Sequence, residues 1–241
     1  MLWRSSRRGL LTLTPGVLGA SPPFDPATLS PHLWLDPSDL STLFQTDNES
    51  TPVTTDGQAV GRINDKSGNG RHLIQTAAGL RPLYKTSGGL RWLQFDGIDD
   101  GLERAAPSLS SGLSFYAAHA PDAGEELWLW AYGDGASFYG VVQASASSPN
   151  SNAGAPTYRI NGVAPGGSTR QDLLTAIPAN STKVTVAESL DLSGWGNFVI
   201  ARYGAFELAG KCYGLILVPD LSSANRAQLE TWMGAKAGLV L

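Results

Sequence analysis

The sequence predicts an all-β protein, a sandwich of antiparallel sheets, from three observations. Glycine (28) and proline (15) are plentiful while charged residues make up only 16%, a balance that suits short strands joined by tight turns better than a helical bundle. From residue 32 onward, short apolar runs alternate with turn signals. Only one segment, near the C-terminus, has a helical pattern. With 42% apolar residues in 241 positions, the chain is able to fill one sizeable core.

The predicted strands are apolar runs bounded by turn residues. In residues 90–103, Asp96-Gly97 is a turn dipeptide that separates two short strands. In residues 126–133 both faces of the expected strand are apolar, which is typical of a strand in the middle of a packed sandwich. The remaining strands are predicted at residues 33–36, 112–120, 182–192, 197–203 and 211–218.

The clearest local signals are one turn and one helix. Asn161-Gly162 lies between two β-type runs and predicts a two-residue hairpin, because both turn positions need positive φ. Residues 221–238 predict a helix with Ser222 or Ser223 as N-cap and Gly238 as C-terminal stop. Its apolar face contains Leu229, Trp232, Met233 and Ala237, and we expect it to lie across an edge or the bottom of the sandwich.

Bulk properties narrow the partners. A net charge of −4 and a pI near 5.3 give a nucleic-acid partner no electrostatic support. The lone Cys212 excludes an internal disulfide framework, and its apolar run predicts a buried side chain. No apolar stretch approaches membrane-spanning length. We therefore expect neither a nucleic-acid nor a membrane partner, and no cofactor.

The first 30 residues have a composition of their own. Arg7 and Arg8, followed by an apolar stretch, are similar to a twin-arginine export signal. However, Thr12, Thr14, Pro15 and Gly16 interrupt that stretch. We therefore favour a docking arm that binds a partner subunit, with the proline-rich residues 21–31 as linker. The residues expected to anchor it are Trp3, Arg4, Arg7 and Arg8.

The order of the motifs "LWLDPSD", "VGRINDKSGNGRHLIQ", "RPLYKTSGGLRWLQFDGIDDGLE", "YRINGV" and "KCYGLILVPDLSSANRAQLETWMGAKAGL" resembles the laminin-G-like, concanavalin A-like lectin-glucanase modules. Such modules are frequent in bacterial surface proteins and bacteriophage virion proteins. The resemblance spans residues 31 to 241. It implies a jelly-roll β-sandwich of two curved antiparallel sheets with a short C-terminal helix, following an extended N-terminal arm at residues 1–30.

The stretch "NDKSGNGRH", residues 64–72, has the opening of a calcium loop. Asp65 and Asn69 are its candidate ligands, but the glutamate expected at the twelfth loop position is replaced by Thr76. Gly68 and Gly70 suit a tight turn. We therefore interpret the stretch as a structural turn rather than a metal site. Asp96, Asp99 and Asp100 are the carboxylates that would complete a non-standard site.

The sequence contains no residue spacing that is typical of a catalytic site. Glucanases of the resembled superfamily carry glutamates in an E-x-D-x-x-E pattern, whose acid and nucleophile share a strand face. Here Glu125 and Glu126 are adjacent and would point to opposite faces. His32, His72 and His119 lack a nearby nucleophile or zinc motif. "GDGAS" and "APGGST" have the composition of phosphate loops, yet neither is predicted to open a helix. We therefore predict that the protein is not an enzyme.

Aromatic side chains offer the best candidate binding site, because flat rings cover the apolar face of a sugar. Trp195 lies between two glycines, and Tyr132 and Tyr139 flank a glycine-rich loop. These three residues are the predicted glycan contacts. Trp34, Trp92 and Trp232 lie in apolar patterns and are predicted to belong to the core.

These observations lead to a ranked set of functions. The first is a structural protein of a phage particle, on a tail fibre, the tail or the head surface. It would be anchored by its arm to other virion proteins, present in many copies, and bind host polysaccharide. The second is an exported bacterial lectin-like protein of the periplasm or cell surface. A glycoside hydrolase ranks lower, and a purely mechanical role in the particle is a rival to the adhesive one.

Overall fold

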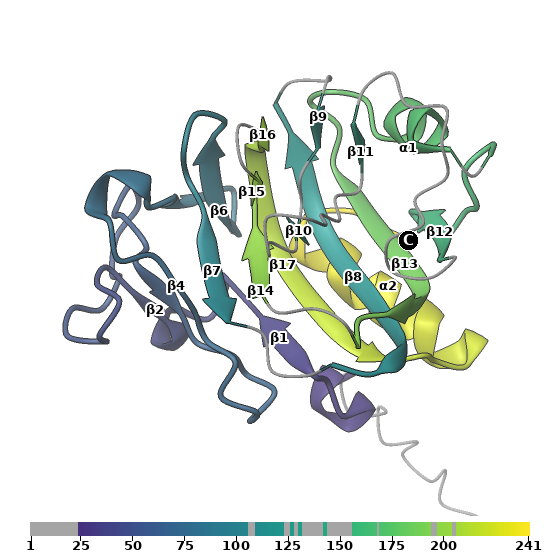
Figure 1. Ribbon diagram of the computed structural model, residues 1–241, viewed down its shortest axis with the longest axis horizontal. Helices are drawn as coiled ribbons and strands as arrows, with labels where there is room; N and C mark the ends of the chain where they lie inside the picture. Colours follow the sequence, from purple (N-terminus) through teal and green to yellow (C-terminus); the bar gives the residue numbers. More distant parts are fainter. Residues whose placement is uncertain are drawn as a thin grey trace, which may run out of the picture.

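The computed structural model describes residues 24–105, 109–122, 126–127, 130–131, 142–143, 156–167, 169–193, 197–203 and 206–241. Two antiparallel sheets dominate the fold, and they face each other across a shared core (Figure 1). The predicted all-β sandwich is therefore confirmed at the level of its two sheets, and so is the C-terminal helix.

The large sheet has seven strands in the order β12-β13-β8-β17-β6-β5, with β1 also paired to β17. Its strands are β1 (Leu33–Leu35), β5 (Leu83–Ser87), β6 (Leu90–Asp96), β8 (Ser111–Pro121), β12 (Thr157–Ile160), β13 (Lys183–Asp191) and β17 (Ala209–Pro219). On one side, β17 pairs with β8 along its whole length. On the other, it pairs first with β6 and then with β1.

The second sheet has six short strands in the order β10-β14-β7-β4-β3-β2. Its strands are β2 (Leu43–Phe44), β3 (Arg62–Ile63), β4 (Leu73–Ile74), β7 (Leu102–Ala105), β10 (Trp130–Ala131) and β14 (Asn197–Ile200). Two further pairs join β9 (Glu126–Leu127) to β11 (Val142–Gln143), and β15 (Arg202–Tyr203) to β16 (Phe206–Glu207). All of these pairings are antiparallel.

The helices are few. Three short 3-10 helices are η1 (Pro26–Leu29), η2 (Leu40–Thr42) and η3 (Ala78–Leu80), and the α-helices are α1 (Arg170–Ala176) and α2 (Ser223–Lys236). Helix α2 begins after its N-cap Ser222, whose hydroxyl accepts from the backbone of Asn225. Gly238, just past its end, has φ +76°, so both predicted ends of this helix are confirmed.

The main core lies between the sheets. Alternate residues of the long strands turn their side chains inward, as the period of two requires. The large sheet contributes Leu93, Phe95, Phe115, Leu215 and Leu217, and the second sheet Leu43, Ile63, Leu73, Leu102, Phe198 and Ile200, all buried. Cys212 is buried in the same cluster, as predicted.

A second apolar cluster covers the opposite face of the large sheet. Helix α2 packs there through Leu229, Met233 and Ala237, and Figure 1 shows it behind the sheet, on the side away from β7 and β14. The helix therefore covers a sheet face rather than an edge. The other members of this cluster are Trp34, Tyr116, Ala118, Ala120, Val184, Val186, Tyr213, Ile216 and Val218, with Trp92 and Trp232 packed against them.

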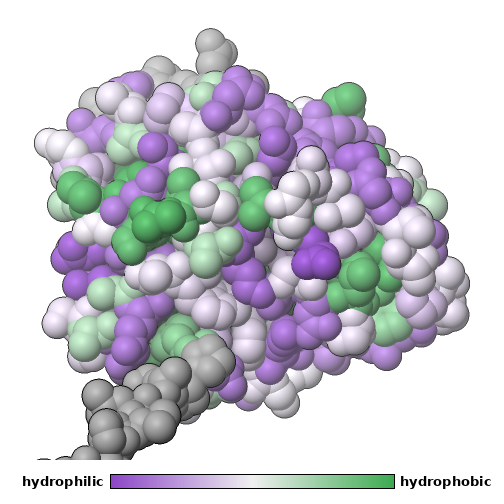
Figure 2. All heavy atoms as spheres, turned by 180° about the vertical axis from the view of Figure 1, so that it is seen from behind, coloured by the Kyte–Doolittle hydropathy of each residue, from purple (hydrophilic) through white to green (hydrophobic). Residues whose placement is uncertain are grey.

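Figure 2 shows this helix-bearing face from outside. Hydrophobic side chains form separate small groups among hydrophilic ones on the described surface. The large hydrophobic residues exposed in the described chain are Leu83, Ile98, Val163, Val240 and Leu241. Singly exposed apolar side chains are normal for a soluble surface, so they do not indicate an extensive apolar interface here.

Four local predictions need correction. Of the strand expected at residues 126–133, the structure describes two short pieces, β9 and β10, which pair in different sheets. The strand expected at 197–203 is divided at Ala201, which has φ +67°. Positive φ at Asn161 and Gly162 confirms the predicted turn. However, the turn is followed by a single bridge, Ile160 to Val163, and not by a second strand within residues 162–167, while β12 pairs with β13.

The fourth correction concerns the segment "APGGST", which does open a helix. Thr169 is the N-cap of α1, and its hydroxyl and the Asp172 side chain form a reciprocal capping box. The sequence contained this signal, since a threonine followed three positions later by an acidic residue is a helix start. The helix has seven residues, and the carboxylate of Asp172 already accepts from the Thr169 N–H and hydroxyl at its N-terminus.

Within the described chain, no helix is long and apolar enough to cross a membrane.

The packing of α2 leads to a stability prediction. Met233 is fully buried between the helix and the sheet, so Met233→Ala should lower the free energy of unfolding by about 2 to 4 kcal/mol. Gln228 is exposed on the same helix, and Gln228→Ala should change it by less than about 0.5 kcal/mol. Urea unfolding followed by circular dichroism measures both. Equal effects of the two substitutions would contradict this packing.

Candidate functional site

The turn at residues 64–72 is organised by one buried carboxylate. Asp65 Oδ1 accepts hydrogen bonds from the backbone N–H groups of Trp34 and Ser67, each at 2.9 Å. Asp65 Oδ2 accepts from the Arg71 N–H at 2.9 Å and from the Ser67 hydroxyl at 2.7 Å. The carboxylate thus ties the turn to β1. Its four acceptor positions are all used within the chain.

The rest of the turn matches the prediction from sequence. Gly68 and Gly70 have φ of +84° and +66°, where a side chain would be strained. Asn69 Nδ2 donates to the carbonyls of Pro31 (3.0 Å) and His32 (3.2 Å), so it fastens the turn to the segment before β1. Asp65 and Asn69 therefore have structural partners that account for their positions.

A polar groove opens between this turn and the segment that leads into β1. Its volume is about 440 Å³. The polar residues that line it are Ser30, His32, Lys66, Ser67, Asn69 and Arg71, and Ala27 of η1 lies at its side. Among the described hydrogen bonds, none engages the side-chain oxygen of Asn69 or the Nε and Nη2 groups of Arg71. The groove thus presents acceptors and donors side by side, as hydroxyl-rich ligands require.

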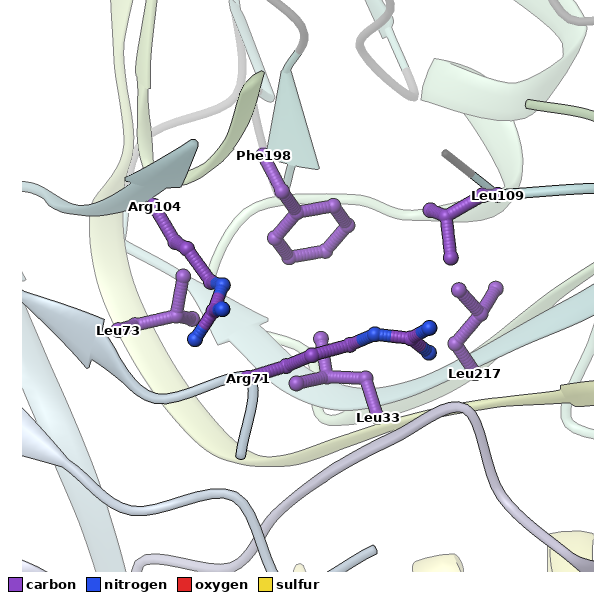
Figure 3. Close-up of a pocket in the computed structure, with 7 residues that line it drawn as sticks. All are labelled: Leu33, Arg71, Leu73, Arg104, Leu109, Phe198 and Leu217. Carbon is purple, nitrogen blue, oxygen red and sulfur yellow. The ribbon is translucent and has the colours of Figure 1, made fainter. Parts of the chain in front are cut away.

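Beside the groove, a smaller cavity lies between the two sheets (Figure 3). Its volume is about 20 Å³, and the surface that faces it is apolar. Five apolar side chains surround it, namely Leu33, Leu73, Leu109, Phe198 and Leu217, and two arginine side chains, Arg71 and Arg104, complete its wall. Figure 3 shows these seven side chains arranged around a common centre. Arg71 belongs to both the cavity and the groove.

The positive charges of Arg71 and Arg104 are only partly balanced by nearby acceptors and carboxylates. Arg71 Nη1 donates to the His32 carbonyl at 2.6 Å, and Arg104 Nη1 donates to the Gly70 carbonyl. Arg104 Nε is buried without a hydrogen-bond partner. The described ion pairs include neither residue, and the nearby Asp65 is already saturated. Burial lowers the pKa of Arg71, the Asp65 charge opposes this, and the Arg104 charge adds to it, so two cations share one carboxylate.

Two histidines border this region as neutral groups. Burial, followed by the charge of Arg71, lowers the pKa of His32. Burial, followed by the charge of Arg62, lowers the pKa of His72, while Asp65 opposes this. His72 Nδ1 accepts from the Asp65 backbone N–H at 3.1 Å, which requires an unprotonated nitrogen. Neither imidazole therefore adds positive charge near pH 7.

A separate acidic cluster follows β6. The carboxylates of Asp96, Asp99 and Asp100 lie within 4.8 Å of one another, and oxygen ligands of this kind suit Ca²⁺. Asp65 and Asn69 are not part of the cluster. Burial, and then the charge of Asp96, raises the pKa of Asp100 to about 6. Asp96 Oδ1 already accepts from the Ile98 and Asp99 N–H groups, so hydrogen bonds within the loop account for much of this arrangement.

Glu188 and Glu230 are two buried glutamates, the residue type that glycosidases use as acid and nucleophile. Glu188 accepts from Arg159 Nε at 3.2 Å and from Arg226 Nε at 2.6 Å. Burial raises the pKa of Glu230, whose Oε1 has no partner, whereas both arginines lower it. Both glutamates are buried on the face of the sheet that α2 covers. Neither the groove nor the cavity is lined by a carboxylate, so neither offers the acid and nucleophile of a glycosidase.

His119 is buried on the inner face of the large sheet. Its Nε2 lies 2.8 Å from the Thr185 hydroxyl, and its Nδ1 has no partner. Burial, with a smaller effect of Lys183, lowers its pKa to about 3. His119 is therefore a core residue in which only one of the two ring nitrogens is hydrogen-bonded.

Several predicted site residues lie outside the described chain. These are the proposed glycan contacts Trp195, Tyr139 and Tyr132 and the anchoring residues Trp3, Arg4, Arg7 and Arg8. Glu125 lies outside it as well, and the side chain of Glu126 is not described. The glycan-contact and anchoring assignments stay predictions.

Sequence reasoning missed the two arginines. Arg71 belongs to the quoted turn, but its position after two glycines reads only as a solvated charge. Arg104 lies 33 positions later, in β7 of the other sheet. No local pattern connects the two residues, because only the packing of the turn against β7 and β14 brings them to one cavity.

Comparison with known proteins identifies no relative. No family model matches the chain. No curated protein and no solved structure matches it significantly either.

The saturated carboxylate of Asp65 leads to a prediction. In Asp65→Asn an amide N–H₂ group must replace one acceptor oxygen, so it faces N–H donors instead of accepting from them. We expect unfolding free energy to fall by about 2 to 3 kcal/mol. Asp47→Asn, which removes an exposed carboxylate 3.6 Å from Arg81, should cost less than about 0.5 kcal/mol. Chemical denaturation of both variants decides, and a tolerant Asp65→Asn would mean that the turn is held by other contacts.

Asp100 leads to a pH prediction. Because its folded pKa of about 6 lies above its ordinary value of 3.8, the folded state binds the proton more tightly. This carboxyl group therefore favours folding at pH 4 and progressively less as the pH rises to 6. Asp100→Asn should raise stability at pH 7.5, relative to the parent chain, by about 1 kcal/mol after allowance for solvent screening. The gain should vanish near pH 4, as thermal melts at both pH values would show. A gain that does not depend on pH would contradict the assignment.

Proposed function

We propose that this chain is a non-enzymatic structural and binding protein of a bacteriophage particle. In this proposal, residues 31–241 form a laminin-G-like jelly roll that binds glycans of the host surface, and residues 1–30 attach it to other virion proteins. The polar groove between η1 and the turn at residues 64–72 carries the proposal. It combines volume, cations and free hydrogen-bonding groups on a rigid β scaffold.

The pairing of the strands supports the jelly-roll assignment. Long connections bring β17 beside β8 and β6, and β14 beside β7. Antiparallel neighbours that are distant in sequence are typical of Greek-key sandwiches. In such folds the sheets are rigid and the loops bind ligands. The groove is built from loops of this kind, and from the turn whose conformation Asp65 fixes.

The chemistry of the groove supports a saccharide ligand. Saccharides present adjacent hydroxyl groups that donate and accept at once. Asn69 Oδ1 and the free nitrogens of Arg71 are matching partners. A single site of this kind binds weakly, and many copies on one particle would raise its effective affinity. The absence of carboxylates from the groove wall favours binding over sugar hydrolysis there.

The contacts of residues 24–32 decide which deletion best tests the proposed arm. Phe24 and Leu29 pack against the second apolar cluster, on the face of the large sheet that α2 covers. The His32 N–H donates to the Leu217 carbonyl at 2.7 Å. A deletion of residues 1–23 therefore removes the proposed anchor and keeps η1 and the groove. A longer deletion to residue 30 would remove part of the site as well.

The test separates attachment from glycan binding. The chain lacking residues 1–23 should still bind immobilised bacterial surface polysaccharides but no longer attach to phage particles. Ala27→Trp, which fills the groove from an exposed position of η1, should weaken polysaccharide binding about tenfold or more. Ala235→Trp, at an exposed position of α2, is the matched control and should leave it unchanged. Biolayer interferometry and co-sedimentation with particles provide the two measurements.

Three outcomes would overturn parts of this proposal. Attachment that survives the deletion would remove the anchor and favour an exported lectin-like protein. Particle attachment without binding to any polysaccharide would indicate a mechanical role. Polysaccharide binding that Ala27→Trp does not affect would place the glycan site elsewhere on the domain.

A further inference from the structure

The groove and the cavity share one side chain, Arg71, and this connection indicates the chemistry of the ligand. The turn that carries Arg71 is fixed by Asp65 and by the two glycines. The arginine therefore extends from a rigid backbone along the wall between the two spaces. A ligand that contacts Arg71 from the groove therefore contacts a side chain that also lines the cavity.

The charge around Arg71 calls for an anion. Arg71 and Arg104 lie at the same cavity, with no carboxylate partner among the described residues other than the nearby, saturated Asp65. Arg104 also has a buried Nε–H without an acceptor. The charge of Asp65 offsets one of these two cations, so one positive charge in excess is left partly buried, which is unfavourable. A ligand carboxylate restores the balance, and it fits the planar fork of a guanidinium with two parallel hydrogen bonds.

The cavity next to this position calls for an apolar group. Its volume of about 20 Å³ has room for one water molecule or one methyl group. Leucine and phenylalanine side chains and the arginine stems supply its surface, so a water molecule there would lack hydrogen-bond partners. An apolar cavity of this size is filled more favourably by a methyl group.

We propose that the groove binds an acidic saccharide in which one carbon atom carries both a carboxylate and a methyl group. The carboxylate pairs with Arg71, supported by the charge of Arg104, and the methyl group enters the cavity. Pyruvyl ketals and lactyl ethers of polysaccharides have this arrangement. The inference rests on the proposed glycan-binding function and specifies its ligand class.

The test uses a matched series of ligands with the full chain. The pyruvyl ketal is methyl 4,6-O-(1-carboxyethylidene)-galactopyranoside. The ketal is compared with three other ligands: the acetal with hydrogen in place of the methyl, the unsubstituted methyl galactoside, and free 2-methoxypropionate. We expect the ketal to bind about tenfold or more tightly than the unsubstituted sugar. It should bind about fourfold more tightly than the acetal, the ratio expected for one buried methyl group. Isothermal titration measures these ratios.

Variants locate the interaction. Arg71→Gln should abolish the preference for the ketal over the unsubstituted sugar, and Arg71→Lys should retain part of it, because lysine keeps the charge but not the fork. Arg91→Gln, at an exposed position of β6, removes the same charge elsewhere and should have no effect. If Arg71→Gln is poorly folded, the same placement can be tested in the parent chain by NMR. Nuclear Overhauser effects are then expected between the ketal methyl group and the side chains of Leu109 or Phe198.

Each contrary result has a separate meaning. Equal binding of ketal and unsubstituted sugar would overturn this inference and leave glycan binding intact. Equal binding of ketal and acetal would remove the methyl pocket. Free 2-methoxypropionate binding as tightly as the ketal would replace the saccharide by a small acid. If no polysaccharide or sugar probe binds at all, the proposed function itself fails.

Discussion

The architecture depends on one strand, β17, which pairs with other strands along both of its edges and contributes side chains to the apolar clusters on both faces of the large sheet. Strand β17 pairs with β8 along its full length, and on its other side changes from β6 to β1. A register shift between Cys212 and Gly214 marks the change. At this bulge Tyr213 joins the helix-side cluster, while Cys212 and Leu215 on either side belong to the inner core. Gly214 permits the crossing, because a Cβ there would lie 3.3 Å from the Leu35 carbonyl oxygen. The extra residue twists the strand and lets two partners share one edge.

The candidate site is a consequence of the same strand. Because the second half of β17 recruits β1, the chain just before β1 is held at the sheet, and the buried carboxylate of Asp65 then attaches the turn at residues 64–72 to Trp34. The groove lies between these two segments. Leu33 of β1 and Leu217 of β17 form part of the cavity wall. The site is thus built from loops whose backbones are fixed by buried hydrogen bonds, which gives a weak ligand a preformed surface.

The charged groups of the domain fall into two classes. Lys66, which lines the groove, is compensated by Asp39 at 2.6 Å, and Lys236 of α2 is compensated by Asp36 at 2.9 Å. Lys66 lies over the ring of Trp34 and Lys236 over the ring of Trp232. These two tryptophan rings contact each other edge-on and join β1 to α2. Arg71 and Arg104 differ, since they are partly buried without such partners. In a structural ion-pair network the chain itself supplies the partners, and the described ion pairs supply none to these two guanidinium groups.

The features that could be predicted from the sequence are local ones. Apolar alternation, the Asp96-Gly97 and Asn161-Gly162 turns and the caps of α2 depend on neighbouring residues, and so does the turn at 64–72, whose glycines require positive φ. The prediction that the chain folds as an all-β sandwich with a C-terminal helix follows from those signals. Three features became visible only in the folded chain: β9 and β10 belong to different sheets, α2 covers a sheet face, and Arg71 and Arg104 line one cavity. These features depend on which strands pair across long separations, and the free energy of such pairing comes from packing between sheets, which no short stretch of sequence encodes.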